Sequence, residues 1–202
     1  RWKAFLAGRN ARLLSPEEVR GLFGELHVLR KLYQHTLTQT AAVDAWCGPD
    51  ESHQDFIFGN RAIEVKSLSG RERSAVRISS EDQLESLADE LFLLTLRLID
   101  RPDSEEALSL NGVVALISGE LTDAEAIEQL MSKLADVGYA PLAEYDSPCF
   151  VVRDVQGYRV HGAFPCLIRS ELPPGIAKVA YDIRLEAIAL YRCDEAIFFG
   201  GD

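Results

Sequence analysis

The chain has 202 residues, of which 47% are apolar, and its formal net charge is −11. This length suits one large domain, and no run of eighteen apolar residues predicts a transmembrane helix. The charge argues against a protein that coats nucleic acid through a basic surface, but it leaves room for an enzyme that meets phosphates through metal ions. The four cysteines form no CxxC pair, which disfavours a zinc site, and we expect a cytoplasmic protein with reduced thiols.

The first predicted element is a helix that begins after Ser15. Ser15 fits the N-cap position, and Glu18 completes a capping box three residues later. Apolar residues at helical spacing predict a buried stripe, and Glu25 lies on or beside that stripe. Gly21 and Gly24 each weaken a helix by about 1 kcal/mol relative to Ala, so we expect both to allow close packing against a neighbour.

Residues 41–80 show the pattern of an antiparallel meander of short strands. The predicted strands cover residues 41–48, 53–58, 61–68 and 74–79. Trp46 is expected in the core, and Ser80 fits the cap of a short helical turn. The apolar run that follows, residues 90–100, is compatible with a strand or a helix. We favour a strand because polar residues bound the run and a Pro-containing loop follows it.

Two helices with good periodicity are predicted next, over residues 105–121 and 121–139, with Thr122 or Asp123 as the second cap and Gly138 as its end. Beyond residue 146 the pattern predicts strands again, either as a β-rich extension or as a continuation of the same sheet. These strands cover residues 147–164, with a hairpin turn at 154–157, and then 166–172 and 175–188. We therefore divide the chain into a core, 1–145, and a β-rich C-terminal extension packed on it, 146–202.

An acid–base cluster is predicted around the hairpin loop Gly59-Asn60. A two-residue loop there places Asp55 directly opposite Glu64 on one face of the strand pair. Two carboxylates held this close repel each other, and a proton or a cation between them relieves the repulsion. Carboxylate oxygens are common ligands of Mg²⁺. Lys66, on the same face, could orient an attacking water, so these residues predict metal-assisted phosphodiester hydrolysis.

Asp55, followed nine residues later by Glu64-Val65-Lys66, resembles the PD-(D/E)XK motif of the restriction-endonuclease-like superfamily. The resemblance implies an α/β (α+β) fold in which helices flank a mixed sheet. It also implies that Asp55 and Glu64 bind Mg²⁺ (or Mn²⁺) and that Lys66 assists the nucleophilic water. Glu25 matches the place of a further metal ligand on the first helix, and Gln83 matches a Gln that contacts the substrate.

The motifs GLFGEL, W-x-GP, QDFIF, IEVKS and RISSEDQL, in this order, resemble a bacterial family of PD-(D/E)XK proteins of unknown function. Its members are thought to occur beside phage-defence or restriction-like genes. This resemblance implies DNA as a partner, together with other subunits of a defence complex or a second copy of the chain. The chain departs from the pattern in one respect, because Gln54 precedes Asp55 and the literal Pro-Asp pair ends at Asp50. We choose Asp55 because it lies in a hydrophobic strand, and Asp50 stays the alternative.

Simpler interpretations exist for several of these residues. Glu64 and Lys66 would form an ordinary ion pair if they lay on a solvated strand face. Together with Lys66, the residues Arg71, Arg73 and Arg77 predict either a local basic patch that could meet phosphates, with Arg77 as a candidate substrate contact, or an ordinary loop. The leading function is a Mg²⁺-dependent endonuclease acting on DNA in phage defence. The alternatives are a catalytically inactive nuclease-fold subunit that serves as a binding or assembly module, and a hydrolase of another phosphoester.

Overall fold

The computed structural model of the protein describes residues 12–48, 53–70 and 74–199. Its helices are α2 (Pro16–His35), α3 (Gln39–Ala45), α4 (Leu110–Glu120), α5 (Ala124–Asp136) and α6 (Ala196–Phe199). Its strands are β1 (Phe56–Phe58), β2 (Arg61–Ser69), β3 (Ala75–Ile78), β4 (Glu90–Asp100), β5 (Phe150–Val160), β6 (Tyr181–Arg184) and β7 (Arg192–Cys193). Four short 3₁₀ helices are η1 (Glu81–Leu84), η2 (Ala143–Asp146), η3 (Arg169–Glu171) and η4 (Ala189–Tyr191). Within these ranges no helix combines the length and the apolar character that crossing a membrane requires.

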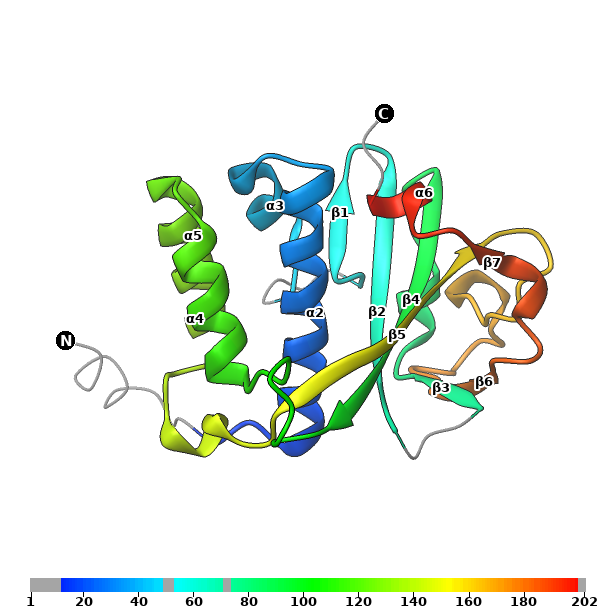
Figure 1. Cartoon of the computed structure of the whole chain (residues 1–202). Helices are drawn as coiled ribbons and strands as arrows, with labels where there is room; N and C mark the ends of the chain where they lie inside the picture. Colours follow the sequence, from blue (N-terminus) through cyan, green and yellow to red (C-terminus); the bar gives the residue numbers. More distant parts are fainter. Residues whose placement is uncertain (1–11, 49–52, 71–73, 200–202) are drawn as a thin grey trace.

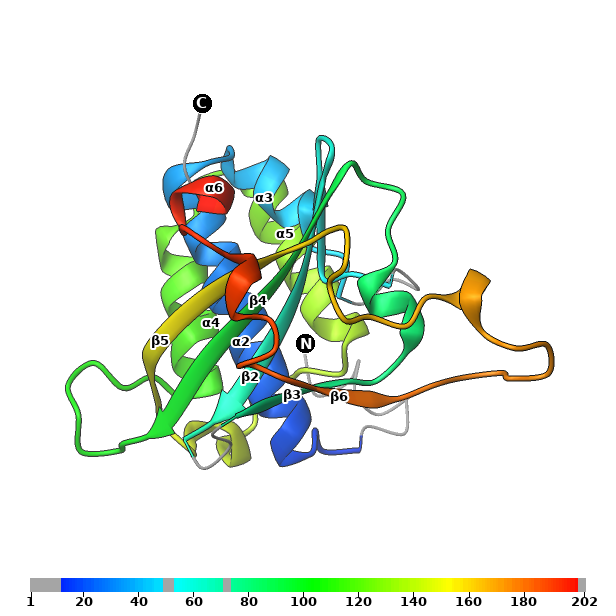
Figure 2. The ribbon, with the colours of Figure 1, turned by 90° about the vertical axis from the view of Figure 1, so that its right-hand side faces the viewer.

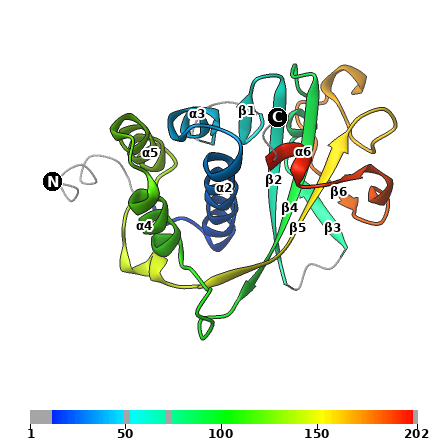
Figure 3. The same ribbon diagram turned by 45° about the horizontal axis from the view of Figure 1, so that its top comes forward.

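A mixed five-stranded sheet forms the centre of the molecule, with the strand order β1-β2-β4-β5-β7. Strands β2 and β4 run parallel, and the other neighbours in this sheet are antiparallel. Figures 1 and 3 show the helices α2 to α5 on one side of this sheet and the small β3–β6 sheet on the other. The predicted mixed sheet flanked by helices is therefore confirmed.

Strand β4 is buried on both faces, which explains its continuous apolar sequence. Alternate residues pack into the core that the helices share: Phe92, Leu94, Leu96 and Leu98. Leu93 points the other way, into a second cluster that includes Tyr158 of β5 and Ile183 of β6. The prediction of a strand rather than a helix in this segment is confirmed.

Helix α2 begins with the predicted capping box. The Ser15 hydroxyl accepts a hydrogen bond from the Glu18 amide at 3.2 Å, and the Glu18 carboxylate accepts one from the Ser15 amide at 2.7 Å. A Cβ added at Gly24 would lie 2.0 Å from the Ser67 hydroxyl on β2, so this glycine allows α2 to approach the sheet closely. Gly21 has no such neighbour within 4 Å, and the prediction of close packing was wrong there because open space surrounds this position.

Two predictions for residues 41–80 were wrong. Residues 39–45 form helix α3, which the Thr38 hydroxyl caps by accepting from the Ala41 amide at 3.3 Å. An alanine-rich run with a good N-cap favours a helix over the strand that we expected. The predicted meander also fails, because β3 pairs with β6 instead of β2. Strand β2 pairs with β4 in parallel, and the connection that a parallel pair needs contains β3 and η1.

The two predicted helices between residues 105 and 139 are α4 and α5. The Asp123 carboxylate caps α5 by accepting from the Glu125 amide at 2.9 Å, so Asp123 is the cap of the two candidates. Gly138, at φ +85°, follows the helix as predicted.

The C-terminal strands differ from the predicted ones. Residues 154–157 form no hairpin, because β5 runs through them and pairs along its length with β4. A Cβ at Gly157 would lie 2.2 Å from the Phe198 ring, so this glycine marks the close approach of α6 and not a turn. Residues 166–172 contain the 3₁₀ helix η3 instead of a strand, and β6 is the strand within 175–188.

Candidate active site

The hairpin of β1 and β2 has the predicted register, with Phe56 opposite Ile63. Gly59 adopts the positive φ of +55° that this tight turn requires. Strand β1 ends at Phe56, so Asp55 lies just outside it, beside the outer edge of β2. There the Asp55 Oδ2 accepts a hydrogen bond from the Val65 amide at 2.7 Å. The Asp55 carboxylate thus takes the place of a strand partner at this point of the edge.

Glu64 and Lys66 lie on the face of β2 that is turned away from α2. The Lys66 Nζ lies 2.7 Å from Glu64 Oε1 and donates a second hydrogen bond to the Gln83 Oε1 at 3.0 Å. The side chains of Glu64 and Lys66 are only 1% and 16% exposed, respectively. The alternative of a solvated strand face with a surface ion pair is therefore excluded. Glu64 Oε2 is buried and has no hydrogen-bond partner among the atoms that the structure describes.

Helix α2 carries Glu25 to the same region. Its Oε2 accepts a hydrogen bond from the indole Nε1 of Trp46 at 2.8 Å. A Cβ at Gly48 would lie 2.6 Å from that Nε1 and 2.7 Å from Glu25 Oε2, so only glycine leaves this hydrogen bond undisturbed. Trp46 is fully buried, as we expected for a core residue, and it also orients Glu25.

Burial and neighbouring charges shift the pKa values of the three carboxylates. Burial and the nearby Asp55 carboxylate raise the pKa of Glu25 to about 8. Burial raises the pKa of Asp55 to about 6. Burial and the Asp55 charge also hold the pKa of Glu64 well above its ordinary range. The Lys66 ammonium lowers the pKa of all three groups. The structure thus brings Glu25, Asp55, Glu64 and Lys66 together.

The chemistry of this donor set fits a hard divalent cation. One oxygen of each carboxylate is engaged, by Trp46, by the Val65 amide or by Lys66. The buried Glu64 Oε2 has no partner of its own and is free to become a ligand. As the side chains stand, no three His, Cys, Asp or Glu residues of the described ranges form a group ready to hold a metal ion. Ligation by the remaining oxygens would therefore require the side chains to rotate.

The other predicted site residues lie in different surroundings. Gln83 is on η1, and its Oε1 accepts from the Ser79 amide at 2.8 Å as well as from Lys66. Arg77 is on β3, is 65% exposed and forms an ion pair with Asp182 at 3.4 Å, and none of its contacts links it to the three acids. A substrate contact by Gln83 or Arg77 stays a prediction. Asp50, Arg71 and Arg73 lie outside the described residues.

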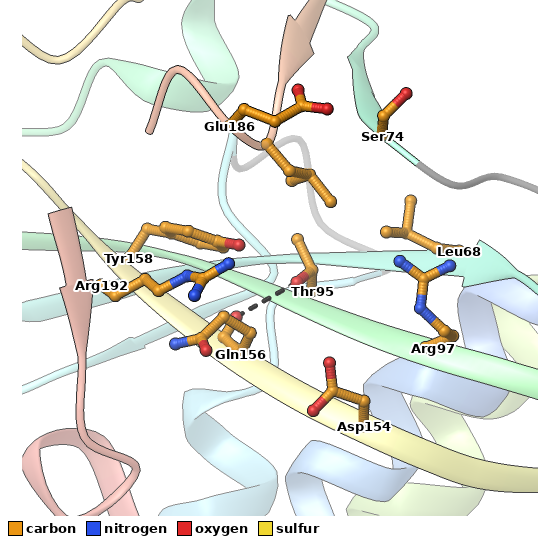
Figure 4. A pocket seen from close by; sticks show the side chains of 10 residues that line it. Leu68, Ser74, Thr95, Arg97, Asp154, Gln156, Tyr158, Glu186 and Arg192 are labelled. Carbon is orange, nitrogen blue, oxygen red and sulfur yellow. Dashed lines mark hydrogen bonds between the residues drawn. The ribbon is translucent and has the colours of Figure 1, made fainter. Parts of the chain in front are cut away.

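A polar cavity of about 410 Å³ opens on the same face of the sheet as Lys66. Its floor includes Thr95, which is the register partner of Lys66 on β4. Figure 4 shows the Gln156 and Arg192 side chains beside Thr95. The Thr95 hydroxyl donates a hydrogen bond to the backbone carbonyl oxygen of Gln156 at 3.2 Å. The charged residues that line the cavity are Arg97, Arg192, Asp154 and Glu186. Opposite charges are balanced there, so the cavity is polar without being strongly basic.

Sequence patterns did not reveal two residues that organise this region. Trp46 was expected only to fill the core, and Gln54 was noted only as a departure from the PD-(D/E)XK pattern. Gln54 is buried, and its Nε2 donates hydrogen bonds to backbone carbonyls of the segment that contains η1. Their places in the W-x-GP and QDFIF segments are the signal that could have identified both.

Comparison with known proteins identifies a family for the chain. No curated protein and no solved structure matches the chain. A family model described as "Putative PD-(D/E)XK family member, (DUF4420)" matches residues 1–186, a range that includes Glu25, Asp55, Glu64 and Lys66. The chain therefore belongs to this PD-(D/E)XK family.

Proposed function

We propose that the protein is a nuclease that hydrolyses DNA phosphodiester bonds with Mg²⁺ or Mn²⁺, and that it acts in the bacterial cytoplasm in a phage-defence or restriction-like system. The observation that carries the proposal is the buried Glu64–Lys66 pair beside two further carboxylates, in a chain of the PD-(D/E)XK family. Burying three acids and an amine in one place lowers the stability of a fold, and such clusters are concentrated at functional sites, which supports a reactive site over a structural one.

Each residue has a distinct proposed role. Asp55 and Glu64 would hold the cation, and Glu25 would supply a further oxygen from α2. When bound, the cation lowers the pKa of water and offsets the negative charge of the phosphate. The Lys66 ammonium would orient the attacking water and stabilise charge that develops on the phosphate oxygens. Gln83 would contact the substrate through its amide nitrogen, because its Oε1 already binds Lys66.

The acidic chain needs local positive charge to hold DNA. Arg192 is exposed and lines the cavity beside Thr95, the register partner of Lys66. Its guanidinium has no hydrogen bond or ion pair with another described residue. We propose that Arg192, and Arg77 on β3, meet phosphates that flank the reacting one. Other subunits of a defence complex, or a second copy of the chain, would provide the rest of the DNA contact.

Cleavage of supercoiled plasmid DNA with Mg²⁺ or Mn²⁺ tests the proposal. We expect Glu64→Gln and Lys66→Met to lower the cleavage rate by about 100-fold or more, because each removes a group that acts on the reacting phosphate. Glu120→Gln is the matched control, since Glu120 also pairs with a basic residue, Arg30, but on the helical side of the molecule. Wild-type rates in both site variants would refute the assignment.

One observation favours an alternative, in which the chain is an inactive nuclease-fold subunit that binds or assembles with a partner. The Glu64 carboxylate already binds Lys66, and no metal-binding group stands ready in the described part of the chain. Isothermal titration calorimetry separates the two functions. Binding of Mg²⁺ or Mn²⁺ that is lost in Glu64→Gln supports the nuclease, whereas no binding at millimolar metal by the folded protein supports the subunit.

A further inference from the structure

The position of Lys66 depends on a short turn of the chain. The 3₁₀ helix η1 carries Gln83, and the Gln83 Oε1 holds the Lys66 ammonium at 3.0 Å. A single 3₁₀ turn has few hydrogen bonds of its own, so contacts from other segments must fix its place. Two side chains supply these contacts, Gln54 from the segment before β1 and Arg169 from the segment after β5.

Gln54 fixes the backbone of the turn. Its Nε2 donates to the carbonyl oxygens of Asp82 and Glu85, each at 2.9 Å, and approaches that of Gln83 at 3.4 Å. The residue is only 6% exposed, so a side chain without donors would remove the partner of the Glu85 carbonyl and leave the Asp82 carbonyl with only the Glu85 amide at 3.2 Å. Because Gln54 directly precedes Asp55, one short segment places the Asp55 carboxylate and also fixes the turn that holds Lys66.

Arg169 fixes the acidic side chains of the same turn. Figure 2 shows the segment after β5 passing beside the turn between β3 and β4. The Arg169 Nη2 lies 2.6 Å from the Oε1 of Glu81, which is fully buried, and 3.6 Å from the Oδ2 of Asp82. The Arg169 amide also donates to the Glu85 carboxylate at 2.9 Å. Loss of the guanidinium would remove the ion pair of the buried Glu81 carboxylate and leave it with the hydrogen bond from the Val179 amide at 2.8 Å, so the turn would be held less firmly in its present position.

We propose that Gln54 and Arg169 are positioning residues that hold Gln83 against Lys66 and thereby direct the Lys66 ammonium at Glu64. The usual motif has Pro before the Asp, and Pro has no side-chain donor with which to do this. The importance of this for hydrolysis rests on the proposed function. The positioning itself can be tested without any cleavage activity.

Reductive methylation of lysines in the full chain, followed site by site with mass spectrometry, tests the positioning. An ammonium held by two acceptors reacts slowly, so release of Gln83 should raise the Lys66 rate by about tenfold. We expect this rise in Gln54→Met, in Arg169→Met and in Gln83→Met, which removes the acceptor directly. Gln39→Met is the matched control, because the Gln39 Oε1 binds the amides of Thr122 and Asp123 on the helical side of the molecule. The Lys66 rate should stay at the wild-type value in this control.

Lys133 provides an internal control in the same spectra, since its Nζ donates to the carbonyls of Val43 and Asp44 on α3. Its rate should not change in any variant. A wild-type Lys66 rate in Gln54→Met and Arg169→Met, alongside a raised rate in Gln83→Met, would overturn the proposal. An equal rise at Lys133 would also overturn it, because general loosening would then be the cause. If Gln54→Met does not fold, the Lys66 rate in Arg169→Met decides the test alone. The Arg169 side chain is 46% exposed, so we expect its replacement to leave the protein folded.

Kinetics add a second readout if the wild type cleaves DNA. Gln54→Met should lower kcat by about tenfold and change KM for DNA by less than about twofold, because the substrate contacts remain. The double variant with Lys66→Met should be no slower than Lys66→Met alone, since Gln54 acts through Lys66. If the wild type does not cleave DNA, the methylation rates still decide the positioning, so the two failures are distinguishable.

Discussion

Replacing Glu25 by Gln is expected to stabilise the metal-free protein at alkaline pH and to change its stability little near pH 4.5. The amide has the shape of the carboxylate and can still accept the hydrogen bond from Trp46 Nε1. It cannot ionise, so the variant never places this negative charge beside Asp55. The substitution therefore separates the charge of Glu25 from its packing.

The size of the effect follows from the pKa of Glu25, which burial and Asp55 raise from 4.5 to about 8. Between these two values the folded protein binds a proton that the unfolded chain has released, so stability falls as the pH rises through this window. At 1.36 kcal/mol per pKa unit, ionised Glu25 costs the folded state about 3 to 5 kcal/mol above pH 8. For a domain of this length that corresponds to a rise in Tm of roughly 10 °C on substitution.

Urea denaturation in EDTA at pH 4.5 and at pH 8.5 measures this difference. Asp55 and Glu64 also have raised pKa values, so the stability of both proteins falls as the pH rises. The effect of Glu25 is therefore the difference between the wild type and the variant in unfolding free energy at each pH. Glu120→Gln is a control of opposite sign, because hydrogen bonds from Arg30 lower the pKa of Glu120 and its loss should destabilise the protein at neutral pH. A Glu25→Gln protein no more stable than the wild type at pH 8.5 would refute the reasoning.

Three further predictions concern two glycines, Gly48 and Gly21, the histidine His27 on α2, and the exposed cavity residue Arg192. Gly48→Ala should weaken Mg²⁺ binding in calorimetry by about tenfold, because the new methyl displaces the Glu25 carboxylate. In contrast Gly21→Ala, in open space, should leave metal binding intact and raise stability by about 0.5–1 kcal/mol. Burial lowers the pKa of His27 from 6.5 to about 4, so the folded state binds fewer protons in that window and stability falls by about 3 kcal/mol as the pH drops through it. His27→Gln should flatten this part of the curve, and an unchanged curve would contradict the assignment. Arg192→Ala should weaken DNA binding and lower the salt slope by about one, and an unchanged slope would exclude a phosphate contact.

Local signals predicted the elements that they control. The capping box of Ser15 and Glu18 predicted the start of α2, and the polar residues and the Pro-containing loop that bound the apolar run of β4 favoured a strand. The errors arose where distant contacts override local ones. Gly157 resembles a turn residue but serves the packing of Phe198, and β3 pairs with a strand about a hundred residues further along the chain.

In the candidate site, too, local sequence signals predicted some features, and contacts between distant segments determine the others. The two-residue loop predicted the hairpin register, from which the proximity of Asp55 and Glu64 follows. The motif segments mark the positions of Trp46 and Gln54, but the contacts that these residues and Arg169 make could not be predicted, because single side chains that reach across the fold leave no periodic pattern in the sequence.

The hydrogen bond from the Val65 amide to Asp55 has a consequence for mutagenesis. Without this hydrogen bond, the edge of β2 that extends beyond β1 would expose an unpaired backbone amide. Exposed strand edges of this kind can pair with strands from other molecules. An alanine at position 55 would remove an acid and also uncover this edge, so self-association would accompany any catalytic defect. Asparagine keeps an acceptor for the amide, and Asp55→Asn is therefore the substitution that isolates the chemistry from aggregation.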